Sequence, residues 1–405
     1  MSALARMQGE RFYRESGFAL NTISPIKAFG DDTFLVTVKG QTMLKRIKNW
    51  LEVRIGIEEL VRTHLTGYLV PRSINLFYTL GFVALAGFIV QVLTGFLLLI
   101  YYVPLPDHAF RSVQNIMVNV PYGWLFRLMH VVGSNLIVVA IGCHLLSVFF
   151  MNSYKKPREL TWFAGACMLL ITLTFCLSGY LLPWSQLSYW ATTIVTNIPS
   201  ALPYLGAFAV TCLQGGQSVS GITLGRFFAL HVVVLPALLL TLVSIHLFLV
   251  RRIGISSPPF DRAGVKEPWT GFRHEEHPDG YPFFPHFVLK ETFMVMALFS
   301  LMFFIITFAP ALFLPEDANV PADPLKTPMH IKPEWYFLAP YQMLKLVPNK
   351  FVGVSLQIIM VTLFLLWPFL DVKKEDNILK RRGLFAFFIV AIIGWVILTI
   401  WGKYS

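Results

Sequence analysis

The chain has 405 residues, of which 56% are hydrophobic and 14% charged, and its mean hydropathy is +0.63. Soluble domains carry about 25% charged residues, so this composition excludes an ordinary soluble protein and indicates an integral membrane protein. The formal net charge of +11 raises the question of a nucleic-acid partner, which the placement of the charges answers below. The four cysteines form no CxxC or CxxCH motif and are interpreted as packing residues.

The chain begins with a polar and basic segment, residues 1–73, without the continuous apolar run of a signal peptide. Within it, residues 44–66 mix apolar and charged positions at helical spacing. This pattern predicts an amphipathic helix lying on the cytoplasmic surface of the membrane. Residues 1–43 show little pattern and are interpreted as an extension that contacts a partner.

Seven apolar runs follow, each near the roughly 20 residues that span a bilayer core. They lie at about 75–102, 123–151, 160–182, 225–250, 287–314, 351–370 and 384–402. With the N-terminus in the cytoplasm, the cytoplasmic segments hold 25 of the 33 Lys and Arg residues. This distribution follows the positive-inside rule and needs no nucleic-acid partner. The prediction is an all-α integral membrane protein with seven transmembrane helices.

Long connections divide the chain. Residues 183–224 and 315–350 both lie outside, and the first is rich in Trp and Tyr with Pro breaks, which predicts short interfacial helices. Long ordered connections usually carry function. The polar segment 252–286 is interpreted as a cytoplasmic linker between a four-helix bundle, 74–251, and a three-helix part, 287–405.

Four of the ten histidines lie inside predicted spans. His130 and His144 are 14 residues apart on the second span, and His231 and His246 are 15 apart on the fourth. At about 100° and 1.5 Å per residue, each pair shares one helix face and spans about 21 Å. Because both spans run inward, His130 opposes His231 near the outside and His144 opposes His246 near the inside. Two bis-histidine haems are predicted; hydrogen-bonded bundle histidines or a proton relay are the alternative.

Glycines recur at the same interval. Gly81 and Gly95 are 14 residues apart on the first span, and Gly165 and Gly179 are 14 apart on the third. Small residues let large groups approach a helix backbone, so the glycines predict clearance for a macrocycle at both haem depths. Helix packing alone would explain one such pair.

Two arginines lie at the outer ends of the histidine-bearing spans. Arg127 precedes His130 by three residues, and Arg226 precedes His231 by five. Both are candidates for binding haem propionates, and the alternative is that they snorkel to the membrane surface.

Longer motifs carry family information over residues 50 to 402. They are WLFRLMH at 124–130, KKPRELTW at 155–162, GYLLPWSQLSYWA at 179–191, TLGRFFALH at 223–231 and PEWY at 333–336. Together they resemble the cytochrome b of quinol-oxidising Rieske/cytochrome b complexes. The 15-residue histidine interval resembles the chloroplast-type cytochrome bf complex, in which the three-helix part is a separate subunit IV. The sequence is similar to a fused form with seven spans.

The sequence departs from that family at three places. Thr79 stands where the bf family has a cysteine that attaches an extra haem, so no covalent c-type haem is expected in this chain. Ser147 stands where many relatives have an arginine. Lys290 and Glu291 resemble the Lys-Asp pair of the respiratory quinone-reduction site, with Glu for Asp.

The resemblance implies a quinol–cytochrome c reductase, or one with a plastocyanin-like acceptor, that operates a Q cycle. Quinol would be oxidised in an outer pocket between residues 179–199 and PEWY. One electron would pass to a Rieske iron–sulfur protein, and the other through the outer and inner b haems to a quinone near the cytoplasm, coupled to proton translocation. A c-type cytochrome subunit, a homodimeric complex and a bacterial energy-transducing cytoplasmic membrane are also implied.

The outer pocket would use residues of two segments. Glu334 in an apolar loop is the candidate base, because quinol oxidation releases protons and desolvation raises a carboxyl pKa. Tyr180 and Tyr336 offer hydroxyls, and Pro333 and Trp335 complete the motif. The alternative is a simple turn with interfacial aromatic rings.

The inner quinone site would lie at the cytoplasmic ends of the spans. Arg251, Lys290 and Glu291 are candidates for quinone binding and proton delivery. Interfacial anchoring explains the same residues equally well.

The sequence leaves two alternative functions. A haem-free proton-coupled transporter would use the histidines as a relay and often shows an inverted repeat, which the sequence lacks. A dihaem membrane anchor of a quinone-linked dehydrogenase or reductase would need neither PEWY nor the outer aromatic segment.

Overall fold

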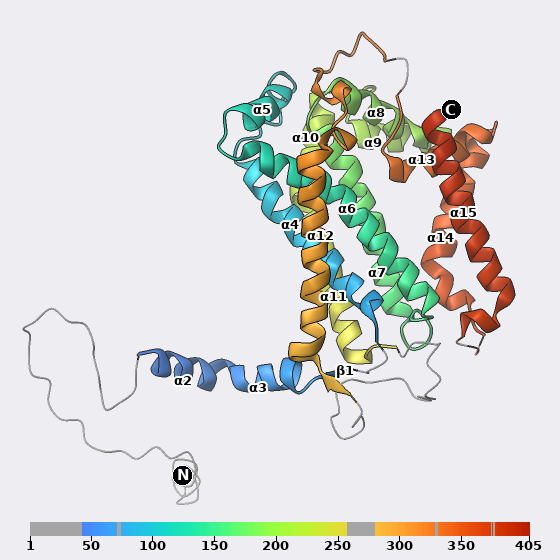
Figure 1. Ribbon diagram of the computed structural model, residues 1–405. Coiled ribbons are helices and arrows are strands. Elements are labelled where there is room, and N and C mark those ends of the chain that lie inside the picture. The colour runs from blue at the N-terminus through green and yellow to red at the C-terminus, as the bar shows by residue number, and fades with distance from the viewer. Residues whose placement is uncertain (1–42, 71–73, 257–279, 329–330, 374, 376) are drawn as a thin grey trace, which may run out of the picture. The chain divides into compact units, whose positions relative to one another are not determined.

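The computed structural model describes residues 43–70, 74–256, 280–328, 331–373, 375 and 377–405 (Figure 1). The chain divides into two units, with the boundary between Glu58 and Glu59. The predicted partner contact of residues 1–42 and the central part of the predicted linker, 257–279, lie outside the described residues.

The predicted helix over 44–66 is found as consecutive helical segments. They are α2 (Met43–Ile55), α3 (Ile57–Val61) and a π-helical turn (Arg62–Thr66). Gly56, with φ +65°, separates α2 from α3, a backbone conformation that glycine adopts without strain. In the first unit, Lys48 and Glu58 form an exposed ion pair of 2.7 Å. The surface position of this helix on a membrane stays a prediction.

Among the described residues, seven helical segments are long and apolar enough to cross a membrane, which confirms the predicted all-α fold with seven spans. The helices that form them are α4 (Leu80–Leu99), α6 (Gly123–Phe150), α7 (Glu159–Leu181), α10 (Gly221–Ala229) continuing into α11 (Leu235–Ile253), α12 (Val288–Phe308), α14 (Lys350–Leu370) and α15 (Arg382–Tyr404). Short 3-10 turns precede or follow them at Leu76–Thr79, Pro310–Leu312, Glu316–Asn319 and Ile378–Lys380, and a π-helical turn at Phe283–Phe287 precedes α12.

The spans pack as pairs. Helix α4 packs against α6, and α7 packs against α11. The three C-terminal spans do not form one layer, because α12 packs against α4 and α6 whereas α14 packs against α7 (Figure 1). One apolar cluster, which includes Val90, Val132 and Met302, joins α12 to the first pair.

The outer connections contain four further helices, α5 (Pro106–Val118), α8 (Gln186–Asn197), α9 (Gly206–Gln214) and α13 (Trp335–Leu346). Helices α8 and α9, with a 3-10 turn at Ile198–Ala201 between them, are the short helices predicted within 183–224. Helix α5 was not predicted. It begins with Pro106 in its first turn and buries Ala109, Ser112, Val113 and Ile116 on one face, a helical spacing within a segment too short and polar to be a span.

The two long outer connections are hydrogen-bonded to each other. Gln186 donates its backbone N–H to the Val320 carbonyl at 2.8 Å and accepts from the Asp323 backbone N–H at 2.7 Å. Trp190 Nε1 donates to the Asp323 carbonyl at 3.3 Å. The segment that precedes PEWY is therefore fixed against the start of α8.

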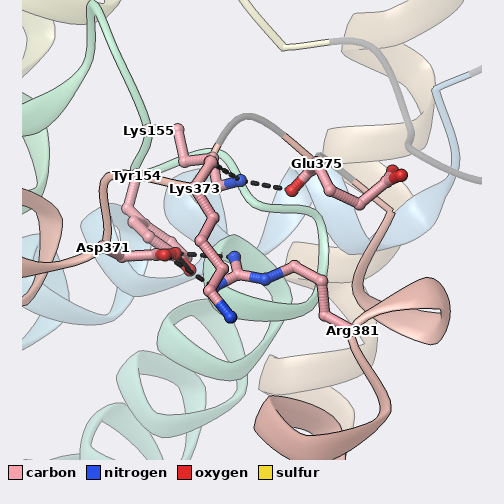
Figure 2. A network of polar contacts seen from close by, with 6 residues as sticks. All are labelled: Tyr154, Lys155, Asp371, Lys373, Glu375 and Arg381. Carbon is pink, nitrogen blue, oxygen red and sulfur yellow. Dashed lines mark hydrogen bonds and ion pairs between the residues drawn. The ribbon is translucent and has the colours of Figure 1, made fainter.

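The opposite end of the spans contains two small structures. Strand β1 (Leu69–Val70) pairs antiparallel with β2 (Tyr281–Pro282) in the register Leu69 to Pro282 and Val70 to Tyr281. The second structure is a polar network between the α6–α7 and α14–α15 connections (Figure 2). There Arg381 forms two hydrogen bonds to Asp371, at 2.6 and 2.7 Å, and the Tyr154 hydroxyl donates to Asp371 at 2.6 Å.

Candidate functional site

The outer histidine pair comes from two helices. His130 on α6 and His231, in a π-helical turn between α10 and α11, have ring centroids 6.3 Å apart and planes inclined by 71°. Metal–imidazole nitrogen distances are about 2 Å, so the rings leave room for one metal ion between them. Two histidines supply only two ligands, and no cluster of three or more His, Cys, Asp or Glu occurs among the described residues. An ion held here needs its other ligands from a macrocycle, which fits a haem.

The inner pair also comes from two helices. His144 on α6 and His246 on α11 lie close enough for their charges to interact. The structure thus brings together the two predicted pairs, at two depths of the same helices.

Each of the four glycines faces one histidine, which is more specific than the clearance predicted. A Cβ built on the glycine would lie 3.1 Å from the nearest imidazole carbon for Gly95 and His130, 2.6 Å for Gly179 and His231, 3.1 Å for Gly81 and His144, and 3.2 Å for Gly165 and His246. Real Cβ contacts are rarely this short. The glycines therefore make room for the imidazole rings themselves.

A π-helical turn over Leu230–Val234 accounts for the unequal histidine intervals. A π turn accommodates one extra residue within an α-helix, and such turns are frequent at functional sites. The 15-residue interval from His231 to His246 therefore corresponds to the 14-residue interval on α6. A single π turn leaves little trace in apolar periodicity, so the sequence of this span predicts a regular helix.

Backbone carbonyls also face the imidazole rings. In three cases the carbonyl belongs to the residue four positions before the facing glycine: Gln91 for His130, Phe175 for His231 and Thr161 for His246. At His144 the corresponding carbonyl, of Phe77, instead accepts a 3.2 Å hydrogen bond from Ser147.

The two predicted propionate-binding arginines differ. Arg127 is buried, with 6% of its surface exposed, and forms no ion pair with any described residue. A buried cation without a carboxylate is costly, which fits a site for an anionic group of a cofactor. Arg226 donates to the backbone carbonyls of Thr211 and Cys212 at the end of α9. It therefore has a structural role in this conformation.

The three predicted outer-pocket side chains come together. Glu334 precedes α13 and interacts with the Tyr180 hydroxyl on α7, while Tyr336 interacts with Cys176. Burial raises the pKa of Glu334, and the hydrogen bond from Tyr180 only partly offsets it. Burial also raises the pKa of Tyr336. The Glu334 carboxyl therefore stays protonated to a higher pH than an exposed carboxyl does.

Other residues of the motif have distinct positions. Trp335 Nε1 donates a 2.9 Å hydrogen bond to Asn135 on α6. Pro333 lies in the irregular segment just before α13 and is half-buried.

The end of α7 presents different residues to two sites. Phe175, Ser178 and Gly179 contact His231, with the Phe175 ring centroid 5.4 Å from that of His231. Cys176 and Tyr180 contact Tyr336 and Glu334 instead. Residues three and four apart on a helix share a face. The last turn of α7 therefore directs one face to the outer histidine pair and another face to Glu334, the candidate base.

The three predicted inner-site residues lie around β2. Arg251 stacks on the Tyr68 ring, 4.3 Å from its centroid, and interacts electrostatically with the buried Glu291. Lys290 donates a 3.1 Å hydrogen bond to the Tyr281 hydroxyl. The structure therefore brings Arg251 and Glu291 together and directs Lys290 to another partner.

Four contacts of the site were not found by sequence reasoning. They involve Thr94, Asn135, Cys176 and Ser178. A signal existed for two of them, since Thr94 and Ser178 directly precede the outer glycines. Thr79, which occupies the position of the bf cysteine, is fully buried and donates to the Leu76 carbonyl at 2.7 Å.

Comparison with known proteins identifies the family. Residues 65–254 match the family described as Cytochrome b/b6/petB, and residues 321–405 match Cytochrome b(C-terminal)/b6/petD. The chain is 38% identical to cytochrome b of Rickettsia conorii over 328 residues, 81% of this chain and 79% of that one. It is 36% identical to the cytochrome bc complex cytochrome b subunit of Chlorobaculum thiosulfatiphilum over 367 residues, 89% of this chain and 81% of that one.

A solved structure is also similar. A chain of a hyperthermophilic respiratory Complex III matches with a TM-score of 0.81 and 38% identity, covering 88% of this chain and 91% of that chain. The protein therefore belongs to the cytochrome b family, as the cytochrome b of a bc-type complex. Membership implies haem b as cofactor, partner subunits, and a core position in a quinol oxidoreductase embedded in a membrane.

Proposed function

We propose that this chain oxidises quinol in an outer pocket formed by α7 and the PEWY segment, and reduces quinone near its cytoplasmic end. The observation that carries the proposal is the arrangement at the end of α7. One set of its side chains contacts Glu334 and Tyr336, and another set contacts His231. The candidate proton acceptor, Glu334, and the outer histidine pair thus lie against different faces of the same turn of α7.

Quinol oxidation releases two protons and two electrons, so the pocket needs a proton acceptor within hydrogen-bond reach. Glu334 has this role, because its carboxyl is partly buried and its raised pKa makes it a stronger base than an exposed carboxylate. The Tyr180 hydroxyl orients the carboxyl and stabilises its ionised form. Trp335 holds the segment against α6 through Asn135.

The cofactor sites are assigned to the two histidine pairs. His130 and His231 would hold an outer haem b, and His144 and His246 an inner haem b, with Arg127 pairing a propionate of the outer one. When bound, the two haems supply one-electron carriers between the outer and inner sides. The facing glycines keep the four imidazole rings close to the helix backbones.

At the inner side, the half-buried Arg251 stacks on Tyr68 and interacts electrostatically with the buried Glu291. This pair would bind the quinone head group, and Glu291 would deliver protons as the quinone is reduced. Lys290, on the Tyr281 hydroxyl, would hold β2 at the edge of the site.

The same proposal includes partners and location. Of the two electrons of quinol, one would go to a Rieske iron–sulfur protein and on to a c-type cytochrome subunit, within a homodimeric complex. Similarity to a subunit of a cytochrome bc complex supports these partners. The predicted cytoplasmic concentration of basic residues supports a bacterial cytoplasmic membrane with the N-terminus inside.

The test is a quinol oxidation assay of the membrane-embedded complex, with a short-chain benzoquinol as donor and oxidised cytochrome c as acceptor. Glu334→Gln is expected to lower kcat/KM at least tenfold while haem content stays unchanged. Asp107→Asn, an exposed acidic residue in the first turn of α5, is the control and should retain full activity. Full activity of Glu334→Gln would contradict the proposal.

A further inference from the structure

The outer and inner histidine pairs differ in one chemical detail. At the outer pair, a hydroxyl lies on Nδ1 of each ring: Thr94 Oγ1 is 2.9 Å from His130 Nδ1, and Ser178 Oγ is 3.1 Å from His231 Nδ1. Both hydroxyl residues are buried, with 3% and 1% of their surface exposed. In each case the residue directly precedes the glycine that faces the same histidine.

The inner pair lacks this feature. The residues before the inner glycines are Leu80 and Ala164, which have no hydroxyl. His246 Nδ1 is buried and has no hydrogen-bond partner of normal geometry among the described residues. Because a backbone carbonyl faces His246 as it faces the outer histidines, the hydroxyl is what distinguishes the two depths.

Each hydroxyl has a backbone carbonyl to which it can donate its hydrogen, which favours one direction for these contacts. Thr94 donates to the Val90 carbonyl at 2.7 Å, and Ser178 donates to the Phe175 carbonyl at 3.2 Å. Each hydroxyl oxygen therefore accepts from the imidazole, so Nδ1 carries the hydrogen and Nε2 keeps a free lone pair. With its NH2 group turned toward His130, the Gln91 amide lies closer to the His130 carbonyl oxygen, at 3.0 Å, than to Nδ1, at 3.3 Å.

We propose that Thr94 and Ser178 are positioning residues that fix the ligating tautomer of His130 and His231 and lower the midpoint potential of the haem that these two histidines hold. The inference rests on the haem ligation given under the proposed function. An Nδ1–H hydrogen bond makes an imidazole a stronger donor through Nε2, and a stronger donor favours the ferric over the ferrous state.

The test is optical potentiometry of both haems in the purified complex, with Thr94→Val and Ser178→Ala. Each variant removes one hydroxyl, so each is expected to raise the midpoint potential of one haem and leave the other unchanged. Since the two hydroxyls contact opposite ligands of one haem, both variants must shift the same haem. Thr172→Val is the matched control, because among the described residues this buried hydroxyl on α7 bonds only the Met168 carbonyl, and the variant should shift neither potential.

A gain of contact provides an independent measurement. Ala164→Ser places a hydroxyl before Gly165 and is expected to lower the potential of the other haem, because no hydroxyl lies on Nδ1 of His246. Unchanged potentials in Thr94→Val, Ser178→Ala and Ala164→Ser, with both haems bound, would overturn this inference and leave the proposed function intact. A wild-type complex without bis-histidine haems would overturn the proposed function itself.

Discussion

Trp335 and Asn135 are 200 residues apart in sequence and share a 2.9 Å hydrogen bond from the indole Nε1 to the amide Oδ1. Asn135 lies on α6 between His130 and His144, and it is buried, with 5% of its surface exposed. Trp335 follows the candidate base Glu334 directly. The contact therefore ties the outer pocket to the helix that carries one histidine of each pair.

Trp335→Phe removes the indole N–H donor and leaves the buried Asn135 Oδ1 without this hydrogen bond. An unsatisfied buried acceptor costs about 1–3 kcal/mol, so the complex should unfold at a lower temperature in a thermal denaturation experiment. Trp395→Phe, on a residue of α15 with 46% exposure, is the control and should have no effect. The double variant Asn135→Leu/Trp335→Phe should recover part of the loss, and a purely additive double variant would show that the contact is not energetically significant.

Gly179→Ala should displace His231, because the new Cβ would lie 2.6 Å from the ring. The expected result is loss of the outer haem from the reduced-minus-oxidised spectrum, with the inner haem retained. Gly95→Ala, at 3.1 Å, should have a milder effect on the same haem. Gly225→Ala on α10 and Gly142→Ala on α6 face nothing within 4 Å and serve as controls. Normal haem content in Gly179→Ala would contradict the arrangement.

The pH dependence of quinol oxidation should reflect the ionisation of the Glu334 carboxyl. Its pKa is raised by burial, so the base is protonated up to a higher pH than an ordinary carboxyl. Activity is therefore expected to rise with pH as the carboxyl ionises, and to fall as the pH drops through the raised pKa. The measurement is kcat/KM against pH, and Glu334→Gln should lose this limb. A limb of the same midpoint in the variant would assign it to another group.

The Asp371–Arg381 pair should stabilise the end of the C-terminal spans (Figure 2). Its side chains are 4% and 9% exposed, and removing one partner of a buried pair costs about 3 kcal/mol. Asp371→Asn is thus expected to lower the unfolding temperature. Glu58→Gln, which breaks the exposed pair with Lys48, should not change it.

The same pair predicts a loss of stability in acid. Burial would raise the Asp371 pKa, but the hydrogen bonds from Arg381 and Tyr154 more than offset it and hold the pKa below 3.8. A carboxyl with a lowered pKa contributes stability above its unfolded pKa and loses it as the pH falls through the folded value. Thermal unfolding should therefore show a loss below about pH 4 that Asp371→Asn lacks, and equal acid sensitivity in the two proteins would contradict the pairing.

Much of the architecture could be predicted because bilayers impose a length and an apolar composition on every span. The pairing of His130 with His231 followed from spacing and direction alone, since helix geometry converts sequence intervals into depth. The end of each span was less predictable, because capping and neighbouring turns set it. Helix α5 was missed for a related reason: its amphipathic face is visible only once a packing partner is known.

Contacts between side chains of different helices were beyond a single sequence. The hydrogen bond from Trp335 to Asn135 depends on how α6 is rotated and on how the PEWY segment enters the bundle. The assignment of Cys176 to packing overlooked its contact with Tyr336 for the same reason. The π turn at His231 changes the helix phase locally, and no residue type marks it in the sequence.

The assignment of one b haem to each histidine pair is tested most directly by a haem count on the purified complex. The count uses the pyridine haemochrome and the dithionite-minus-ascorbate difference spectrum. We expect two b haems per chain. His130→Ala and His231→Ala should each remove one and the same haem, and His144→Ala and His246→Ala the other. Loss of different haems from His130→Ala and His231→Ala, or a wild-type chain without haem b, would contradict the pairing on which the proposed function rests.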